Sequence, residues 1–257
     1  MRRLVVILCA LSCMLTLISE DRASAIAFND QGFELYEEGN FAAALKKFEA
    51  SWRADGSYIY GHYNYACTLG ILIREEPMDW YHMQDAAFDH LERTLKIRPS
   101  YASKMLTDSD LSELRKDFRF YSILGYDVSD PEEAAFVLSS LSWYGAPTSG
   151  IFPYTAGAEF YSDGSFEFWF YTPDWFESFA DEDIYRVDGR YRSREGGVVE
   201  MELDDPMRRK SNLDDIFSAP EVFESRTSFV GTLSPAGELN FEIFDYSFFS
   251  VYERFSA

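Results

Sequence analysis

The hydrophobic pattern of this chain changes near residue 147, and that change limits the folds open to it. From residue 28 to about residue 141, apolar residues recur at helical spacings. Beyond Pro147, apolar and polar residues alternate, as in Phe166-Glu167-Phe168 and Val199-Glu200-Met201. Alternation of this kind is typical of an antiparallel sheet with one buried face. We therefore predict an α+β chain, with N-terminal α-helical hairpins followed by a C-terminal antiparallel β-sheet or small barrel domain.

Turn signals divide the second half into strands. Asp163-Gly164 is a two-residue hairpin signal, and further glycine-containing turns follow at 195–197 and 234–237. A helix is predicted before the sheet, at 129–141, because Asp130 can cap its N-terminus and Pro131 suits its first turn. We predict about six strands, at 157–162, 165–172, 184–193, 197–204, 225–233 and 238–247.

The first 25 residues have the three parts of an export signal. Arg2 and Arg3 precede an apolar run that ends at Ile18, and a small-x-small cleavage pattern ends at Ala25. The run is short for a membrane span, which needs about 20 residues. We expect cleavage after Ala25, with lipoprotein processing at Cys13 as the alternative. The location is then periplasmic or otherwise extracytoplasmic, with no membrane span after cleavage.

This organisation gives four predicted regions. They are a signal peptide at 1–25, a helical domain at 26–125, a helix and linker at 126–147 and a β domain at 148–257. The chain carries a formal net charge of −21. Such a surface repels nucleic acid and anionic lipid, so both are unsuited as partners.

No residue set for catalysis stands out. Cys67 is the one cysteine left after the signal peptide, and His62 lies five residues before it. Residues five apart on a helix point about 140° away from one another, so the two cannot form a nucleophile and its base. His82 and His90 lack the clustered partners of a zinc site. We predict no enzyme activity, no catalytic residue, no metal site and no cofactor.

The first helices resemble the tetratricopeptide repeat. Small and large residues fall at the positions where that family packs its two helices, and Asp55-Gly56 stands where the repeat closes. The matching residues are Gly32, Leu35, Gly39, Phe41, Ala44, Phe48 and Ser51. A second, altered unit has Ala87, Leu91, Thr94 and Pro99 at the positions that correspond to Ala44, Phe48, Ser51 and Gly56, each 43 residues later. Because the family period is about 34 residues, we expect an insertion within 73–83, where Glu-Glu-Pro breaks the helix.

The segment 106–124 resembles the closing element that follows such repeats in some bacterial proteins. In the family, the concave surface of the first helices takes an extended peptide or a partner's helix. The resemblance places these groove residues at Asn29, Phe33, Tyr36, Tyr60, Tyr63 and Cys67. Phe33 stands where carboxylate-binding members have an asparagine, so that specificity is not carried over. The alternative is that these rings pack against a neighbouring part of the chain.

The segment 143–257 resembles, faintly, the small lipocalin-like barrels of bacterial envelope proteins, through Trp143-Tyr144-Gly145 and the hairpin at Asp163-Gly164. That resemblance brings no catalytic residue. The aromatic side chains either fill the interior or leave room for a small apolar ligand. The sequence therefore predicts a non-catalytic interaction protein with a protein or peptide partner. A carrier of a small apolar ligand in the β domain is the first alternative, and an unrecognised envelope enzyme is the second.

Overall fold

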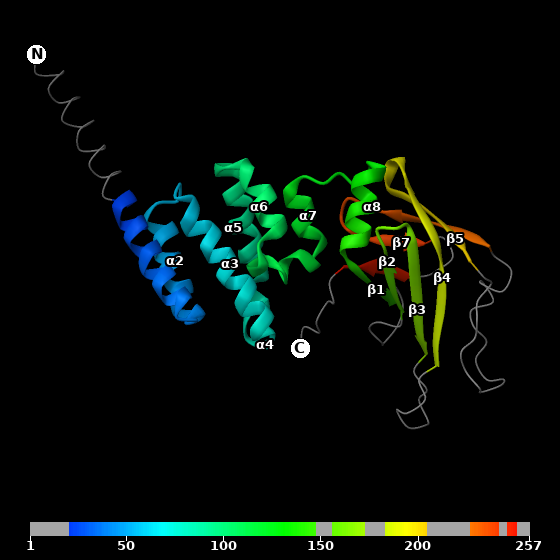
Figure 1. Cartoon of the computed structure of the whole chain (residues 1–257), viewed down its shortest axis with the longest axis horizontal. Coiled ribbons are helices and arrows are strands. Elements are labelled where there is room, and N and C mark those ends of the chain that lie inside the picture. Colours follow the sequence, from blue (N-terminus) through cyan, green and yellow to red (C-terminus); the bar gives the residue numbers. More distant parts are fainter. Residues whose placement is uncertain (1–20, 148–155, 173–182, 205–226, 242–245, 251–257) are drawn as a thin grey trace, which may run out of the picture. The chain divides into compact units, whose positions relative to one another are not determined.

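The structure is a computed structural model that describes residues 21–147, 156–172, 183–204, 227–241 and 246–250 (Figure 1). The chain divides into two units, Met1–Leu114 and Arg115–Ala257. The first unit is helical and the second contains a closed antiparallel barrel of eight strands. The predicted α+β class is confirmed, and the sheet is a barrel. The division falls at Leu114/Arg115, whereas the sequence placed the end of the helical domain at residue 125.

The helical unit begins with a helix over residues 21–37 that precedes α2. Gly39 has a positive φ of 75°, and the Asn40 side chain caps α2 by accepting from the Ala43 amide. These two residues make the tight turn that the sequence predicts here. The remaining elements of the unit are α2 (Phe41–Ala54), α3 (Ile59–Glu75), α4 (Pro77–Trp80), η1 (Tyr81–Met83), α5 (Gln84–Ile97), η2 (Pro99–Tyr101), α6 (Ala102–Thr107) and η3 (Ser109–Leu111).

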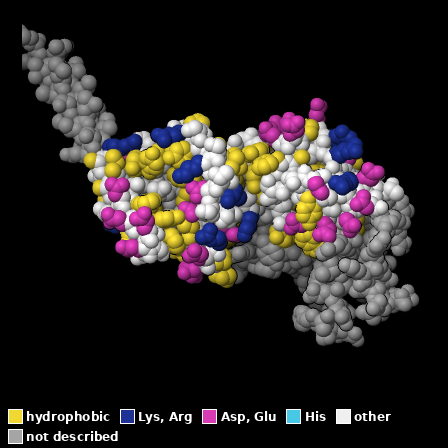
Figure 2. Space-filling view, viewed as in Figure 1, with side chains coloured by type: hydrophobic (Ala, Val, Ile, Leu, Met, Phe, Trp, Pro, Cys, Tyr) yellow, Lys and Arg dark blue, Asp and Glu magenta, His cyan; other side chains and the backbone are white. Residues whose placement is uncertain are grey.

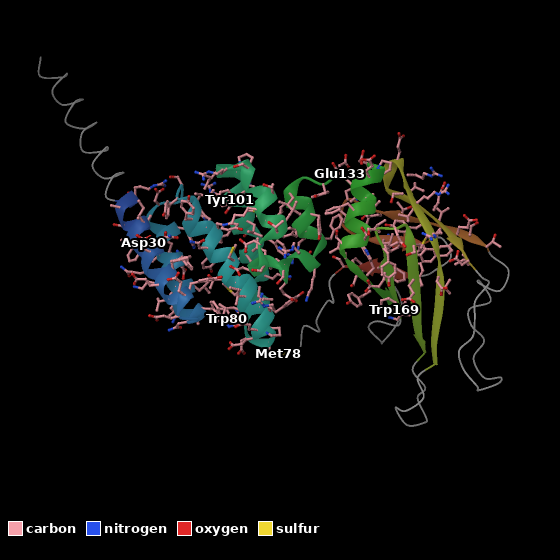
Figure 3. The ribbon with its side chains drawn as sticks, viewed as in Figure 1. Asp30, Met78, Trp80, Tyr101, Glu133 and Trp169 are labelled. Carbon is pink, nitrogen blue, oxygen red and sulfur yellow. The ribbon has the colours of Figure 1, made fainter. Side chains whose placement is uncertain are left out.

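The core of this unit is organised around α3. Most residues of α3 are buried, and the helix contacts α2, α5 and η3. A helix that is apolar on every side needs neighbours on every side. The helix ends at Glu75, two residues before Pro77, as the Glu-Glu-Pro signal predicts. Residues 77–83 form α4, which carries Met78 and Trp80, and η1 (Figure 3).

Two glycines set how closely the helices approach. A Cβ atom at Gly32 would lie 2.6 Å from the Phe48 ring, so the N-terminal helix rests directly on α2. A Cβ atom at Gly70 would lie 2.4 Å from the Asp110 carbonyl oxygen, so the backbone of η3 rests directly on α3. The segment 102–111, which we call the closing segment, is therefore held against the face of α3 that carries Cys67 and Gly70.

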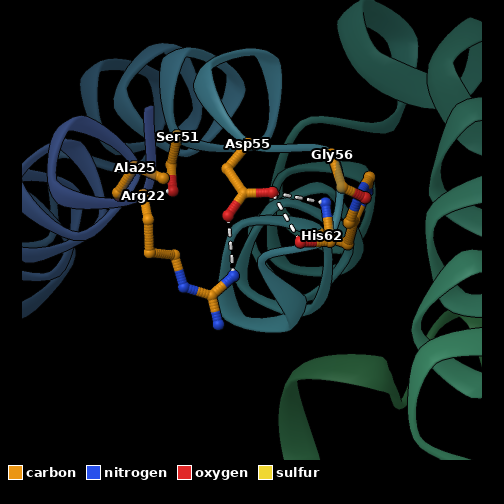
Figure 4. Close-up of polar contacts among 7 residues, drawn as sticks. Arg22, Ala25, Ser51, Asp55, Gly56 and His62 are labelled. Carbon is orange, nitrogen blue, oxygen red and sulfur yellow. Dashed lines mark hydrogen bonds and ion pairs between the residues drawn. The ribbon is translucent and has the colours of Figure 1, made fainter. Parts of the chain in front are cut away.

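The N-terminal helix includes residues that the sequence assigned to the signal peptide. Asp55 accepts a 2.8 Å hydrogen bond from Arg22 and further bonds from Ser57 (Figure 4). The Ser51 hydroxyl donates a 2.7 Å bond to the carbonyl oxygen of Ala25, which is fully buried. Residues 21–25 thus pack on α2 and the turn that follows it. The rest of the predicted signal, including Cys13, lies outside the described residues.

The second unit begins with two helices, α7 (Phe118–Leu124) and α8 (Pro131–Ser140). Asp130 caps α8 by accepting from the Glu132 and Glu133 amides, which confirms the predicted helix start. The α8 helix packs on β2 and β4, and the Trp143 indole of β1 donates to the Leu138 carbonyl at 3.1 Å. The Phe118 amide donates to the Ser250 hydroxyl at 2.7 Å. Both helices therefore belong with the barrel.

The barrel strands follow one another in sequence order and close between the first and the last. They are β1 (Ser142–Pro147), β2 (Ala156–Phe160), β3 (Ser165–Thr172), β4 (Asp183–Arg194), β5 (Val198–Leu203), β6 (Ser228–Leu233), β7 (Leu239–Phe241) and β8 (Tyr246–Phe249). The first five predicted strands correspond to β2–β6. The predicted strand at 238–247 was wrong as a single element, because β7 and β8 pair antiparallel with Leu239 opposite Phe248. The residues of β1 were assigned to the linker, and they instead close the barrel by pairing with β8.

The predicted alternation appears directly in the burial of the strands. Phe166 and Phe168 are buried, as are Val199 and Met201, whereas Glu200 is exposed. The inward side chains form a cluster of phenylalanine rings whose neighbouring centroids lie 5.0–6.4 Å apart. Its members include Phe160, Phe166, Phe168, Phe229, Phe241 and Phe248. These rings occupy the described part of the barrel interior.

Candidate functional site

The groove residues that the sequence predicts lie on two neighbouring helices of the first unit. Asn29, Phe33 and Tyr36 belong to the N-terminal helix, and Tyr60, Tyr63 and Cys67 belong to α3. The Asn64 amide of α3 donates a 2.9 Å hydrogen bond to the Asn29 side chain, which joins the two helices. Asn29 is therefore a buried joint between the helices and does not face solvent.

The closing segment divides the other five residues into two groups. Tyr63 and Cys67 are only 2% and 4% exposed, because the closing segment covers them. Phe33 and Tyr60 remain 49% and 42% exposed, and Tyr36 is half-buried. Tyr63 and Cys67 therefore serve the packing of the chain itself, whereas the rings of Phe33 and Tyr60 are exposed at the surface. Figure 2 shows hydrophobic side chains interspersed with acidic and basic ones over one face of the helical unit.

A pocket of about 130 Å³ lies where the N-terminal helix, α3 and the closing segment meet. The sequence did not identify the contribution of the closing segment to this site. Its Asp-x-Asp-Leu pattern was the signal available, but nothing local shows that these carboxylates turn toward the groove. The side chains used below are Phe33 and Tyr36 from the first helix, Tyr63 and Cys67 from α3, and Lys104, Asp108 and Asp110 from the closing segment.

Two tyrosine–aspartate hydrogen bonds cross this pocket. The Tyr36 hydroxyl donates to Asp110 Oδ2 at 2.6 Å, and the Tyr63 hydroxyl donates to Asp108 Oδ2, also at 2.6 Å. Burial raises the pKa of both tyrosines, and the hydrogen bonds to the carboxylates raise it further. Both hydroxyls therefore stay protonated at neutral pH and act as donors. The bonds tie the closing segment to both helices.

Cys67 lies at the floor of the pocket. Its sulfur and one oxygen from each of Asp108 and Asp110 lie within 4.8 Å of one another. Burial raises the pKa of the Cys67 thiol well above its ordinary value, and the charge of Asp108 raises it further. A thiol that resists deprotonation is a poor nucleophile. The pocket therefore combines two carboxylates with aromatic rings, and both kinds of group attract cations.

His62 and Cys67 have separate partners, as helical geometry predicts. His62 Nδ1 lies 2.7 Å from His90 Nδ1, and His62 Nε2 lies 3.0 Å from the Gly56 carbonyl oxygen. The Trp52 ring lies against both imidazoles. His90 therefore pairs with His62, whereas His82 is exposed on η1. Burial lowers the pKa of both paired histidines, that of His90 to about 4.

Two further observations bear on what this chain is. Among the residues that the structure describes, no helix has both the length and the apolar character needed to cross a membrane. Comparison with known proteins adds no relative: no family model, no curated protein and no solved structure matches this chain.

Proposed function

We propose that this chain is a non-catalytic exported protein whose helical unit binds a peptide segment of a partner protein. The observation that carries the proposal is the exposure of Phe33 and Tyr60 on the two helices that flank the pocket. Aromatic residues are enriched at protein interfaces because a large ring buries much area for little loss of side-chain entropy.

The proposal includes tetratricopeptide-type packing of the helices. Supporting it, Ala44 and Phe48 of α2 are buried, and so are Ala87 and Leu91 of α5, which stand at the corresponding positions of the second unit. The close contact of Gly32 with Phe48 is also of the kind that small residues allow between paired helices. The closing segment covers the open side of α3, so two units suffice.

The β domain is proposed to act as a structural or second binding module. A carrier function has less support, because the phenylalanine cluster occupies the described part of the barrel interior. Native mass spectrometry of the purified chain tests the carrier alternative. A co-purifying small apolar ligand would favour it over the interaction proposal.

The experiment for the main proposal is peptide selection against the full chain, starting from a random peptide library. The Phe33→Ala/Tyr60→Ala double variant should lose most of the selected binding, since it removes both exposed rings. Met78→Ala is the matched control, because Met78 is 90% exposed and lies on α4, away from the pocket residues. Equal binding by both variants and the parent chain would end the proposal.

A further inference from the structure

The two tyrosine–aspartate pairs of the pocket differ in one respect. Lys104 stands beside the first pair: its Nζ lies 3.9 Å from Asp108 Oδ2 and 4.4 Å from the centre of the Tyr63 ring. This pair thus has a cation that contacts both the carboxylate and the ring. The first pair therefore shows that a carboxylate beside a tyrosine ring accommodates a positively charged group.

The second pair has the same carboxylate and ring but no such cation. The Asp110 carboxylate accepts a hydrogen bond from the Tyr36 hydroxyl, and the Asp110 backbone amide donates one to Asp108 Oδ1 at 3.2 Å. Among the described residues, no lysine or arginine nitrogen lies within ion-pair distance of the Asp110 carboxylate. Asp110 is half-buried, and one of its oxygens lies within 4.8 Å of an Asp108 oxygen. Two carboxylates this close favour a positive charge beside them.

The wall next to Asp110 is aromatic and accessible. Phe33 and Tyr36 are stacked, with ring centroids 6.0 Å apart and planes inclined by 11°. Phe33 is half exposed, so a flat group can lie on its ring from solvent. Planar cations bind such faces well, and arginine does so more often than lysine.

From these contacts, and resting on the proposed function, we propose that the pocket binds the guanidinium group of an arginine in the partner's peptide. The guanidinium lies against Phe33 and donates to the Asp110 carboxylate, which gives the second pair the cation that Lys104 provides for the first. The pocket volume of about 130 Å³ is well below that of small-molecule sites, about 300–1,000 Å³. It therefore suits one side chain. The chain's net charge of −21 adds long-range attraction for a basic partner.

The experiment uses the full chain and a pair of probes that differ in charge but hardly in shape: N-acetyl-arginine methylamide and N-acetyl-citrulline methylamide. Backbone amide shifts in a two-dimensional NMR titration report where each probe binds. We expect the arginine probe to shift the amides of residues 33, 36 and 110, and the citrulline probe to bind at least about tenfold more weakly, as expected when a charged hydrogen bond is lost. Higher salt should weaken binding of the arginine probe.

Two variants localise the effect. Asp110→Asn keeps an acceptor for Tyr36 but removes the charge, so binding of the arginine probe should fall about tenfold. Asp30→Asn removes one exposed charge from the N-terminal helix and should leave binding nearly unchanged (Figure 3). The proposal is overturned if citrulline binds as well as arginine or if Asp110→Asn binds normally. It is also overturned if Zn²⁺ binds stoichiometrically in a Cys67-dependent manner.

The outcome is separable from that of the proposed function. Selected peptides that bind at Phe33 and Tyr60 but carry no arginine, and that tolerate Asp110→Asn, would refute the guanidinium pocket and leave the interaction function standing. Binding of the arginine probe without any selected peptide would support the pocket and refute the peptide groove.

Discussion

His62 and His90 face one another across α3 and α5 with their Nδ1 atoms 2.7 Å apart. The Gly56 carbonyl oxygen can only accept, so His62 Nε2 carries a proton, and neutral His62 must accept at Nδ1. His90 Nδ1 is then the donor. A proton on both facing nitrogens would place two N–H groups against one another, so the pair cannot become doubly charged without separating.

From this histidine pair we predict that the free energy of unfolding decreases at acidic pH. Burial lowers the folded-state pKa of His62, and that of His90 to about 4, below the ordinary value of 6.5. The contribution of the neutral histidine pair to the free energy of unfolding is therefore complete above pH 6.5, and it is lost as the pH falls from 6.5 toward 4. We expect the histidine pair to account for roughly 1–2 kcal/mol of this loss, after allowance for partial exposure.

Urea unfolding at pH 7.5 and pH 4.5 measures the effect. His90→Phe should reduce the difference in unfolding free energy between the two pH values, because only the folded parent chain holds His90 neutral by burial. His82→Asn is the control, since it removes one exposed histidine. If both variants keep the full pH dependence of the parent chain, the pair is not its source.

Gly70 predicts a second effect, on the closing segment. Gly70→Ala would place a Cβ atom 2.4 Å from the Asp110 carbonyl oxygen, so the closing segment must move away. We expect a loss of about 1–3 kcal/mol in the free energy of unfolding and faster labelling of Cys67 by a thiol reagent. Gly56→Ala is the control, because its Cβ atom would meet nothing closer than 3.9 Å. The chain for labelling carries Ser at positions 9 and 13. Unchanged labelling in Gly70→Ala would mean that the closing segment does not protect the thiol.

Residues 21–25 provide a third prediction, which concerns processing. Cleavage after Ala25 removes the carbonyl acceptor of Ser51 and the Arg22 partner of Asp55, whereas processing at Cys13 keeps both. Ser51→Ala should therefore cost about 1 kcal/mol more in a chain that starts at residue 21 than in one that starts at residue 26. Urea unfolding measures this difference on four chains: the parent sequence and Ser51→Ala, each starting at residue 21 or at residue 26. Mass spectrometry of the protein isolated from cells identifies which N-terminus occurs, and an equal cost of Ser51→Ala in both backgrounds would show that the Ala25 contact contributes nothing.

The barrel interior gives a fourth prediction. Phe168 is fully buried and contacts several rings of the cluster. Phe168→Ala should lower the free energy of unfolding by about 3–5 kcal/mol, because the removed ring leaves a cavity that a barrel cannot collapse to fill. Tyr161→Ala, at an exposed position, should change it far less. Chemical unfolding of both variants provides the comparison, and a similar loss in each would show that the cluster is not the core of the unit.

The sequence predicts the elements that local patterns define. The α8 helix follows from its Asp130 cap and Pro131, and β2–β6 follow from alternation and turn signals. By contrast, β1 contains Gly145 and ends at Pro147, residues that weaken a strand signal, and its pairing with β8 depends on a contact about a hundred residues away. The candidate site likewise has a part that local patterns predict and a part that depends on contacts between distant residues. The helical register finds Phe33 and Tyr60, but the approach of Asp110 to Tyr36 depends on how Gly70 admits the closing segment.

The pairing of β1 with both β2 and β8 has a consequence for recognition by the second unit. Among the described residues, each barrel strand has a hydrogen-bonded neighbour on either side, although β4 pairs with β5 only from Gly189 onward and β6 pairs with β7 only from Gly231 onward. Many sheet proteins capture a partner by adding its backbone as one more strand, and the paired stretches of the described strands leave no place for that addition. A partner that contacts these paired stretches has to recognise their outward side chains. Its specificity is then set by residues such as Arg192 and Glu200, which lie opposite one another on β4 and β5.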